Sequence, residues 1–231
     1  MSLRPEYRTY HFAGHDEHVL CFGAEASRQI LIIPPLFDEM NRCRRMLVQA
    51  MRGLAERRTG SFLLDLPGCN ESLAALENQN LSTWREAVST AAAQLGATHI
   101  ASLRGGALVD DGAPNLPHWR LTPAKGSSLL KTMIRTRIAG DKEADKTTSE
   151  AGLMEAAKTG PIELAGNMLG PAMVEELAST EPAEVAQLRL RALGQDIAGS
   201  TLWLRAEPQD DPAMSAAIAA DLDKWSASCG G

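Results

Sequence analysis

The residues whose chemistry is easiest to read in this sequence form a short turn, Ser102-Leu103-Arg104-Gly105-Gly106. An apolar segment enters this turn and small residues follow it. This is the pattern of a strand that ends in a sharp elbow with a nucleophile at its tip, written small-x-nucleophile-x-Gly. The tip residue is Arg104, whereas catalysis needs serine, cysteine or aspartate there. A guanidinium stays protonated at ordinary pH and cannot attack a carbonyl. The turn therefore has the form of a catalytic elbow without its nucleophile.

The other members of a catalytic triad are also incomplete. In proteins with such an elbow, the chain order is nucleophile, acid, histidine. Asp210 or Asp211 could take the place of the acid, but no histidine follows His118. Loss of a single triad member already costs several orders of magnitude in rate. We therefore do not expect an ordinary serine-esterase mechanism.

Arg104 allows two interpretations. A guanidinium beside a helix N-terminus is a good environment for a carboxylate or a phosphate, so the elbow could bind an anionic ligand. The candidate ligand-binding residues are then Arg104, Gly105, Leu36, Phe37, Asn41 and Ser72. Alternatively, Arg104 forms an internal salt bridge with Asp38, Glu39 or Glu71, because buried arginines usually have protein partners.

A rival catalytic interpretation uses other groups near the elbow. Cys69 could be a displaced nucleophile activated by a nearby cation such as Arg104. Asp38 or Glu39 could instead hold a reactive water. The structural alternatives are that Cys69 is a small buried residue in a turn and that the Ser72 hydroxyl caps that turn.

Composition excludes several other classes of protein. The formal charge of −6 over 231 residues argues against a nucleic-acid-binding protein, which usually carries a basic patch. No run of about 18 apolar residues exists, so no membrane span is expected. The first residues, Met1 to Glu6, contain no apolar signal-peptide core. Four scattered cysteines without a C-x-x-C pair predict reduced thiols in a cytoplasmic protein. The five histidines show no metal-ligand spacing, so neither a metal nor a cofactor is expected.

The first half of the chain alternates between strands and helices. Apolar helical stripes are predicted to run from Cys43 to Leu54 and from Trp84 to Leu95, the second after a Thr83–Glu86 capping box. Short joints between strands and helices imply right-handed crossovers and a mostly parallel sheet. The predicted strands are 7–12, 19–22, 28–33, 62–66, 99–103 and 119–121.

The second half is predicted to carry a small helical cap, residues 125–193, inserted over the strand ends of a single domain, 1–231. Its helices are expected within 129–138, 148–158 and 171–178. A strand at 200–206 then returns to the sheet, and Asp211-Pro212 starts a last helix.

Three segments together resemble the exosortase A system-associated hydrolase 2 family, whose members are α/β-hydrolase-like. They are Ile33–Met46, Leu64–Ser72 and Leu103–Ala107. The arginine at the elbow is part of this resemblance, since it looks like a trait of that family. The resemblance implies an α/β fold of the α/β-hydrolase type, a three-layer sandwich, in a bacterium that sorts surface proteins and makes exopolysaccharide.

The resemblance also bears on the end of the chain. Folds of this type usually continue beyond the last helix with a further strand and a histidine-bearing loop, whereas this chain ends at Cys229-Gly230-Gly231. The fold is therefore expected to be shortened at its C-terminus, and a second subunit could cover the open sheet edge in a homodimer. The expected function is non-catalytic binding or scaffolding in exosortase-associated export. The alternative is an ester or thioester hydrolase.

Overall fold

A seven-stranded sheet forms the centre of the computed structural model, which describes residues 4–229. Residues 1–3 and 230–231 lie outside the described residues. The expectations about a signal peptide and about the C-terminal end of the fold rest partly on them. The strand order is β1-β2-β4-β3-β5-β6-β9. The β1–β2 hairpin and the β2–β4 pair are antiparallel, and all other pairs are parallel. The strands are β1 (Glu6–Phe12), β2 (His15–Phe22), β3 (Gln29–Ile33), β4 (Gly60–Leu64), β5 (His99–Leu103), β6 (His118–Leu121) and β9 (Leu188–Arg191).

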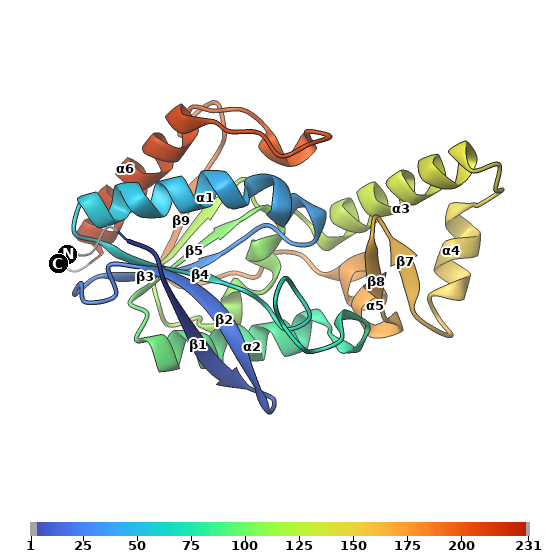
Figure 1. The fold of residues 1–231 in the computed structure, drawn as a ribbon, viewed down its shortest axis with the longest axis horizontal. Coiled ribbons are helices and arrows are strands. Elements are labelled where there is room, and N and C mark those ends of the chain that lie inside the picture. Colours follow the sequence, from blue (N-terminus) through green and yellow to red (C-terminus); the bar gives the residue numbers. More distant parts are fainter. Residues whose placement is uncertain (1–3, 230–231) are drawn as a thin grey trace.

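Helices cover both faces of this sheet, which makes three layers (Figure 1). Helices α1 (Asp38–Glu56) and α6 (Pro212–Ser228) pack together on one face, and α2 (Leu81–Leu95) lies on the other. The strands supply apolar side chains to both layers because successive residues point to opposite faces. In β3, Ile30 and Ile32 pack toward α1, whereas Leu31 and Ile33 pack toward α2.

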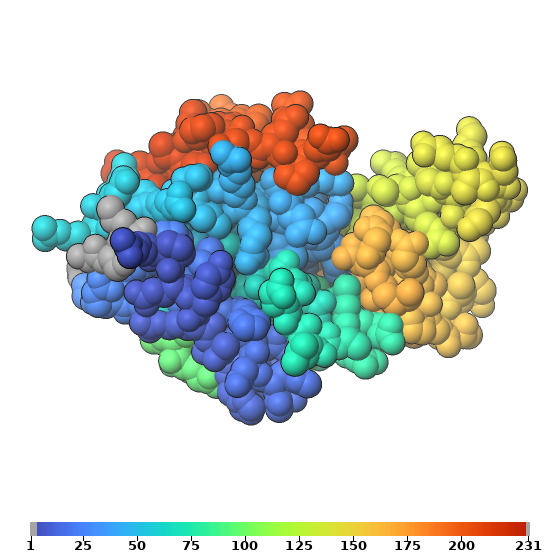
Figure 2. Space-filling model, in the orientation of Figure 1, coloured from blue at the N-terminus to red at the C-terminus, as the bar shows by residue number. Residues whose placement is uncertain are grey.

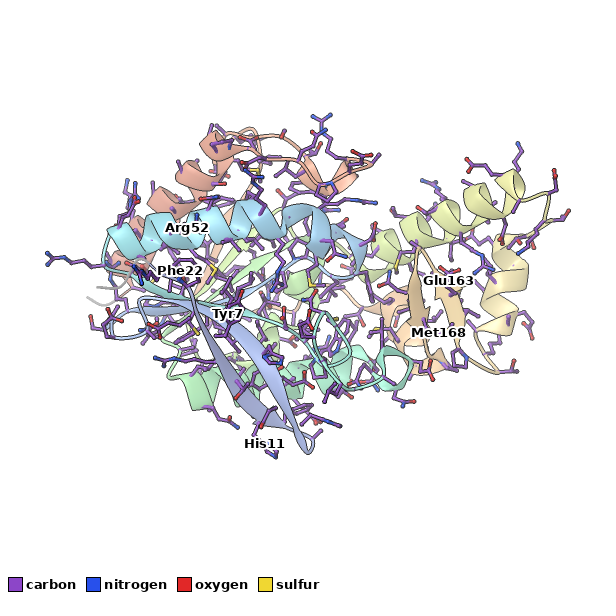
Figure 3. All side chains as sticks on the ribbon, viewed as in Figure 1. Tyr7, His11, Phe22, Arg52, Glu163 and Met168 are labelled. Atoms are coloured by element: carbon purple, nitrogen blue, oxygen red, sulfur yellow. The ribbon has the colours of Figure 1, made fainter. Side chains whose placement is uncertain are left out.

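Residues 126–179 form a cap that projects beyond the carboxyl ends of the strands (Figures 1 and 2). Glu163 and Met168 mark its small hairpin (Figure 3). The chain enters and leaves the cap at one point, where the amide of Gly126 donates to the carbonyl oxygen of Thr180 at 2.9 Å. The cap contains α3 (Gly126–Glu143), α4 (Glu150–Ala156), β7 (Ile162–Leu164), β8 (Asn167–Leu169) and α5 (Pro171–Ser179).

Two predicted elements differ from the structure. The segment 200–206 is not a strand but contains the 3-10 helix η4 (Leu202–Leu204), because Leu202 and Trp203 are buried against α1 and α6 rather than paired in the sheet. The sheet continues instead with β9, which lies inside the range expected for the cap. Helix α2 begins at Leu81, and its cap is Asn80, whose side chain accepts from the amide of Thr83; the Thr83–Glu86 capping box does not form.

Three further 3-10 turns lie in the connections between these elements. They are η1 (Leu76–Asn78), η2 (Arg104–Leu108) and η3 (Asp110–Gly112). Helix α6 begins where the sequence predicts, with the Asp211 side chain accepting from the amide of Met214 at 2.9 Å.

Candidate functional site

The elbow forms as the spacing predicts, but it is followed by the 3-10 turn η2 and not by the expected α-helix, so no α-helix N-terminus points at the site. Strand β5 ends at Leu103, and Arg104 adopts a φ of 52°, in the left-handed region that few non-glycine residues occupy. Gly106 allows the turn to approach β3 closely, because a Cβ atom there would lie 2.5 Å from the carbonyl oxygen of Pro34 and 2.7 Å from that of Ile33. The backbone thus presents the Arg104 side chain at the tip of the turn.

Arg104 forms an internal ion pair at this tip. Its Nε and Nη2 both donate to the Glu39 carboxylate at 3.2 Å, and Nη1 donates to the carbonyl oxygen of Thr122 at 3.3 Å. The guanidinium carbon lies 4.9 Å from the ring centroid of Trp203. Of the three acids expected as partners, Glu39 is therefore the one that pairs with Arg104.

The space beside Glu39, between the start of α1 and the cap helix α3, is almost filled. A cavity of about 10 Å³ remains, roughly the volume one water needs. Leu129 of the cap closes it from above, since a Cβ on Gly105 would lie 2.5 Å from Leu129 Cδ1. The cavity is lined by Leu36, Phe37, Asp38, Glu39, Arg42, Leu129, Thr132 and Met133.

Burial shifts the pKa of the acid in this pair. Desolvation raises the pKa of Glu39 above its ordinary value, and the charge of Arg104 opposes that shift without cancelling it. Asp38, the neighbouring candidate, is bound elsewhere: its carboxylate accepts from Arg42 Nη2 at 2.8 Å. Arg42 also donates to the carbonyl oxygen of Trp203, which holds η4 over the elbow.

Cys69 and Ser72 belong to a separate cluster on the loop after β4. Burial, followed by the charges of Asp65 and Glu17, raises the pKa of the Cys69 thiol to about 12. The Ser72 hydroxyl donates to Glu17 and accepts from the amide of Gly68 at 2.8 Å, so it closes the loop as the structural alternative predicts. Neither residue lines the cavity at the elbow.

The remaining predicted residues are also placed. Leu36 packs against Gly105, and Leu36 and Phe37 both line the cavity beside Glu39. The ring of Phe37 also contacts that of Trp84 in a tilted arrangement, with 5.7 Å between the ring centroids. Asn41 is exposed on α1.

No histidine of the described chain bonds to the elbow. His99 and His118 begin β5 and β6, and His118 Nε2 lies 2.9 Å from the backbone carbonyl oxygen of Asp110. The expected acids do not reach the elbow either, because the strand predicted to precede them does not exist. Asp210 pairs with Arg45 at 3.0 Å, and Asp211 caps α6.

Sequence reasoning missed a buried network just behind the elbow. The hydroxyl of Ser102 donates to Asp110 at 2.7 Å, and Arg120 donates to both carboxylate oxygens of Asp110 at 2.6 and 2.7 Å. All three side chains are buried. The available signal was Arg120 itself, since a charge inside the predicted buried strand 119–121 requires a buried counter-charge.

Two broader searches cover the described residues. None of the helices between residues 4 and 229 combines the length and apolar character needed to cross a membrane. Within the same range, no three His, Cys, Asp or Glu side chains are grouped so that they could hold a metal ion.

Comparisons with known proteins were made for the sequence and for the fold. No protein-family model and no curated protein matches the chain. The structure is similar to a protein from Agrobacterium vitis S4 that carries the name of a hydrolase, with a TM-score of 0.53 and 12% identity over 82% of this chain and 78% of that one. It is also similar to the N-acyl homoserine lactonase AidH, with a TM-score of 0.51 and 14% identity over 82% and 78%. Mouse alpha/beta hydrolase domain-containing protein 10 gives a TM-score of 0.51 and 13% identity over 83% and 78%. The chain therefore has the α/β-hydrolase fold.

Proposed function

We propose that this chain is a non-catalytic binding or scaffolding protein on the α/β-hydrolase fold, with an anion-binding pocket at the elbow. The observation that carries the proposal is the pair of Arg104 and Glu39. A cation replaces the nucleophile, and its carboxylate partner already occupies the position that an anionic ligand would take. With no histidine at hand, acyl transfer at this elbow lacks both nucleophile and base.

Binding of an anion would require it to replace Glu39 on the guanidinium and would require Leu129 of the cap to move, because the cavity beside Glu39 holds only about one water. A carboxylate or phosphate offers the same paired oxygens that Glu39 offers. Because the pKa of Glu39 is raised, mild acid protonates it sooner than an exposed glutamate and weakens its hold on Arg104. Anion binding should therefore strengthen as the pH falls.

A thermal-melting experiment tests this pocket. Acetate and inorganic phosphate should raise the melting temperature of the wild type more at mildly acidic than at neutral pH, relative to chloride at equal ionic strength. Glu39→Gln should bind these anions with less dependence on pH. Arg104→Met should lose the response. An equal anion response in Arg104→Met would refute an anion site at the elbow.

The proposed cellular role, exosortase-associated export in a bacterium, is supported by the resemblance of the segments 33–46, 64–72 and 103–107. Deleting the gene in its host tests this role. Loss of exopolysaccharide or of sorted surface proteins, restored by the Cys69→Ala variant, is the expected result. Unchanged export would contradict it.

The second candidate is an ester or thioester hydrolase, favoured by one observation. Glu39 is a buried carboxyl with a raised pKa, which is a common property of general acids and bases. A panel of nitrophenyl esters and thioesters separates the two functions. We expect no turnover above background. Turnover that disappears in Glu39→Gln or in Cys69→Ala would establish the hydrolase.

A further inference from the structure

Strand β9 ends the sheet with one open side. It pairs with β6, and no strand among residues 4–229 pairs with its other side. The amide of His118 donates to Gln187 and that of Thr122 donates to Arg191, so alternate residues direct their backbone toward β6. The backbone N–H and C=O groups of Leu188 and Leu190 therefore point to the open side, where the carbonyl oxygen of Leu190 accepts from Arg191 Nη1 of the same strand at 3.4 Å. Such an edge is a template for another strand.

The side chains of β9 divide by face. Leu188 and Leu190 are 38% and 54% exposed on one face. Arg189 and Arg191 lie on the face that packs against α6. Arg191 donates to Asp221 of α6 at 2.7 and 2.9 Å. Arg189 is exposed, and its charge acts to lower the pKa of Asp221. A hollow of about 370 Å³ adjoins the start of the strand and is lined by Gln187, Leu188, Arg189, Trp225, Ser228 and Cys229.

A second copy of the chain fits this edge poorly. Two copies of β9 paired antiparallel about a two-fold axis would place residues of the same face opposite each other. The leucine side chains of the two copies would then face each other, and the exposed Arg189 would face Arg189 of the other copy in the same register. Like charges directly opposite each other in a sheet are destabilising. The charges of the edge favour a strand that carries carboxylates.

We propose that the open edge of β9 binds an extended segment of a partner protein in which apolar residues alternate with Asp or Glu. The segment adds a strand to the sheet through the backbone of Leu188 and Leu190. Its apolar side chains pack beside the two leucines, and its carboxylates face Arg189 on the α6 side. This recognition combines main-chain hydrogen bonds with alternate side-chain contacts.

A labelled peptide tests the edge directly. We would measure fluorescence anisotropy with a short fluorescein-labelled peptide that alternates valine with glutamate, and with a matched peptide that alternates valine with lysine. The acidic peptide should bind at least about threefold more tightly, because its carboxylates face the exposed Arg189 whereas the lysines of the other peptide would be repelled by it. Arg189→Glu should reverse the preference. Arg52→Glu, which makes the same charge change on α1, should not (Figure 3).

A proline variant isolates the backbone contact. Leu190→Pro removes an N–H that does not bond to β6, so the fold should survive. We expect its affinity for the acidic peptide to fall by about tenfold or more, whereas Leu190→Ala, which keeps the N–H, should lose less. Hydrogen exchange at the amides of Leu188 and Leu190 should slow when the acidic peptide binds.

Three results would overturn the proposal: equal binding of both peptides, unchanged binding by Leu190→Pro, or a dimer in sedimentation that Leu190→Pro dissociates. The last result would assign the edge to a second copy. These measurements do not involve Arg104 or Glu39. A negative result for the β9 edge would therefore not bear on the proposed anion pocket at the elbow, which the melting experiment tests separately.

Discussion

At the scale of single residues, Arg104 combines a strained backbone with a well-satisfied side chain. A non-glycine residue in the left-handed region costs about 1–3 kcal/mol where the surroundings enforce it. Here the side chain is held by Glu39, by the carbonyl oxygen of Thr122 and by the ring of Trp203. The elbow thus retains the backbone form of a nucleophile turn while its contacts are those of a structural ion pair.

Replacing Arg104 should therefore destabilise the fold. Arg104→Met leaves the buried Glu39 carboxylate without its partner, which should lower the free energy of unfolding by about 3 kcal/mol. Adding Glu39→Gln should recover much of this loss. Arg45→Met, which breaks an exposed pair with Asp210, should change stability by less than about 0.5 kcal/mol. Urea unfolding measures all three, and an unchanged Arg104→Met would indicate a free cation that faces a ligand.

The raised pKa of Glu39 predicts a dependence of stability on pH. A folded-state pKa above the unfolded one means that the folded protein binds more protons, so stability falls as the pH rises through that interval. The wild type should lose stability relative to Glu39→Gln as the pH rises from roughly 4.3. The loss should be larger in Arg104→Met, where the opposing charge is gone. Parallel stability curves for wild type and Glu39→Gln would show that the folded environment leaves Glu39 unperturbed.

At the scale of elements, the turn after β5 depends on one close backbone approach. In Gly106→Ala, the new methyl group would press on the carbonyl oxygens of Pro34 and Ile33, which are backbone atoms and cannot turn away. We expect a loss of about 2 kcal/mol in the free energy of unfolding. Gly140→Ala in α3 is the control, since nothing lies within 4 Å and a helix interior favours alanine by about 0.5–1 kcal/mol. Two equal effects would contradict this account.

The elements that the sequence predicts well are those with buried apolar runs. The bounds of β5, 99–103, agree with the structure because every residue of that strand is buried. Strand β9 was missed since its Leu-Arg-Leu-Arg sequence is exposed at an edge. Leu202-Trp203-Leu204 was mistaken for a strand because a short apolar run does not reveal whether it pairs or only packs.

The candidate site could be predicted from the sequence only where it depends on a local pattern of residues. The spacing around Gly105 and Gly106 locates Arg104 at the elbow, since the pattern is local. The choice of Glu39 among three acids depends on how α1 enters beside β5. The Ser102–Asp110–Arg120 network depends on the pairing of β5 with β6, which sequence spacing does not specify.

At the scale of the whole molecule, the cap and the body share one hydrophobic cluster. Leu177 of the cap and Val88 of α2 are both fully buried in it. A shared core predicts that cap and body unfold in one transition rather than two.

Tryptophan fluorescence can test this cooperativity, because all four tryptophans lie outside the cap. Leu177→Ala should cost about 3 kcal/mol through the cavity it leaves. If unfolding is cooperative, the fluorescence and far-UV circular dichroism transitions should shift together. Leu73→Ala, at an 89% exposed position, should shift neither. A fluorescence transition that stays in place while circular dichroism changes would mean that the cap unfolds alone.

The single point of entry and exit at Gly126 and Thr180 has an evolutionary consequence. A segment whose two ends are already joined can be lengthened, trimmed or exchanged as a cassette without moving the strands on either side. The pairing of β6 with β9 would survive such an exchange, provided that the new segment keeps the apolar contacts through which Leu177 packs into the body. Diversification of relatives should therefore concentrate between these two residues, while the turn beneath keeps its shape.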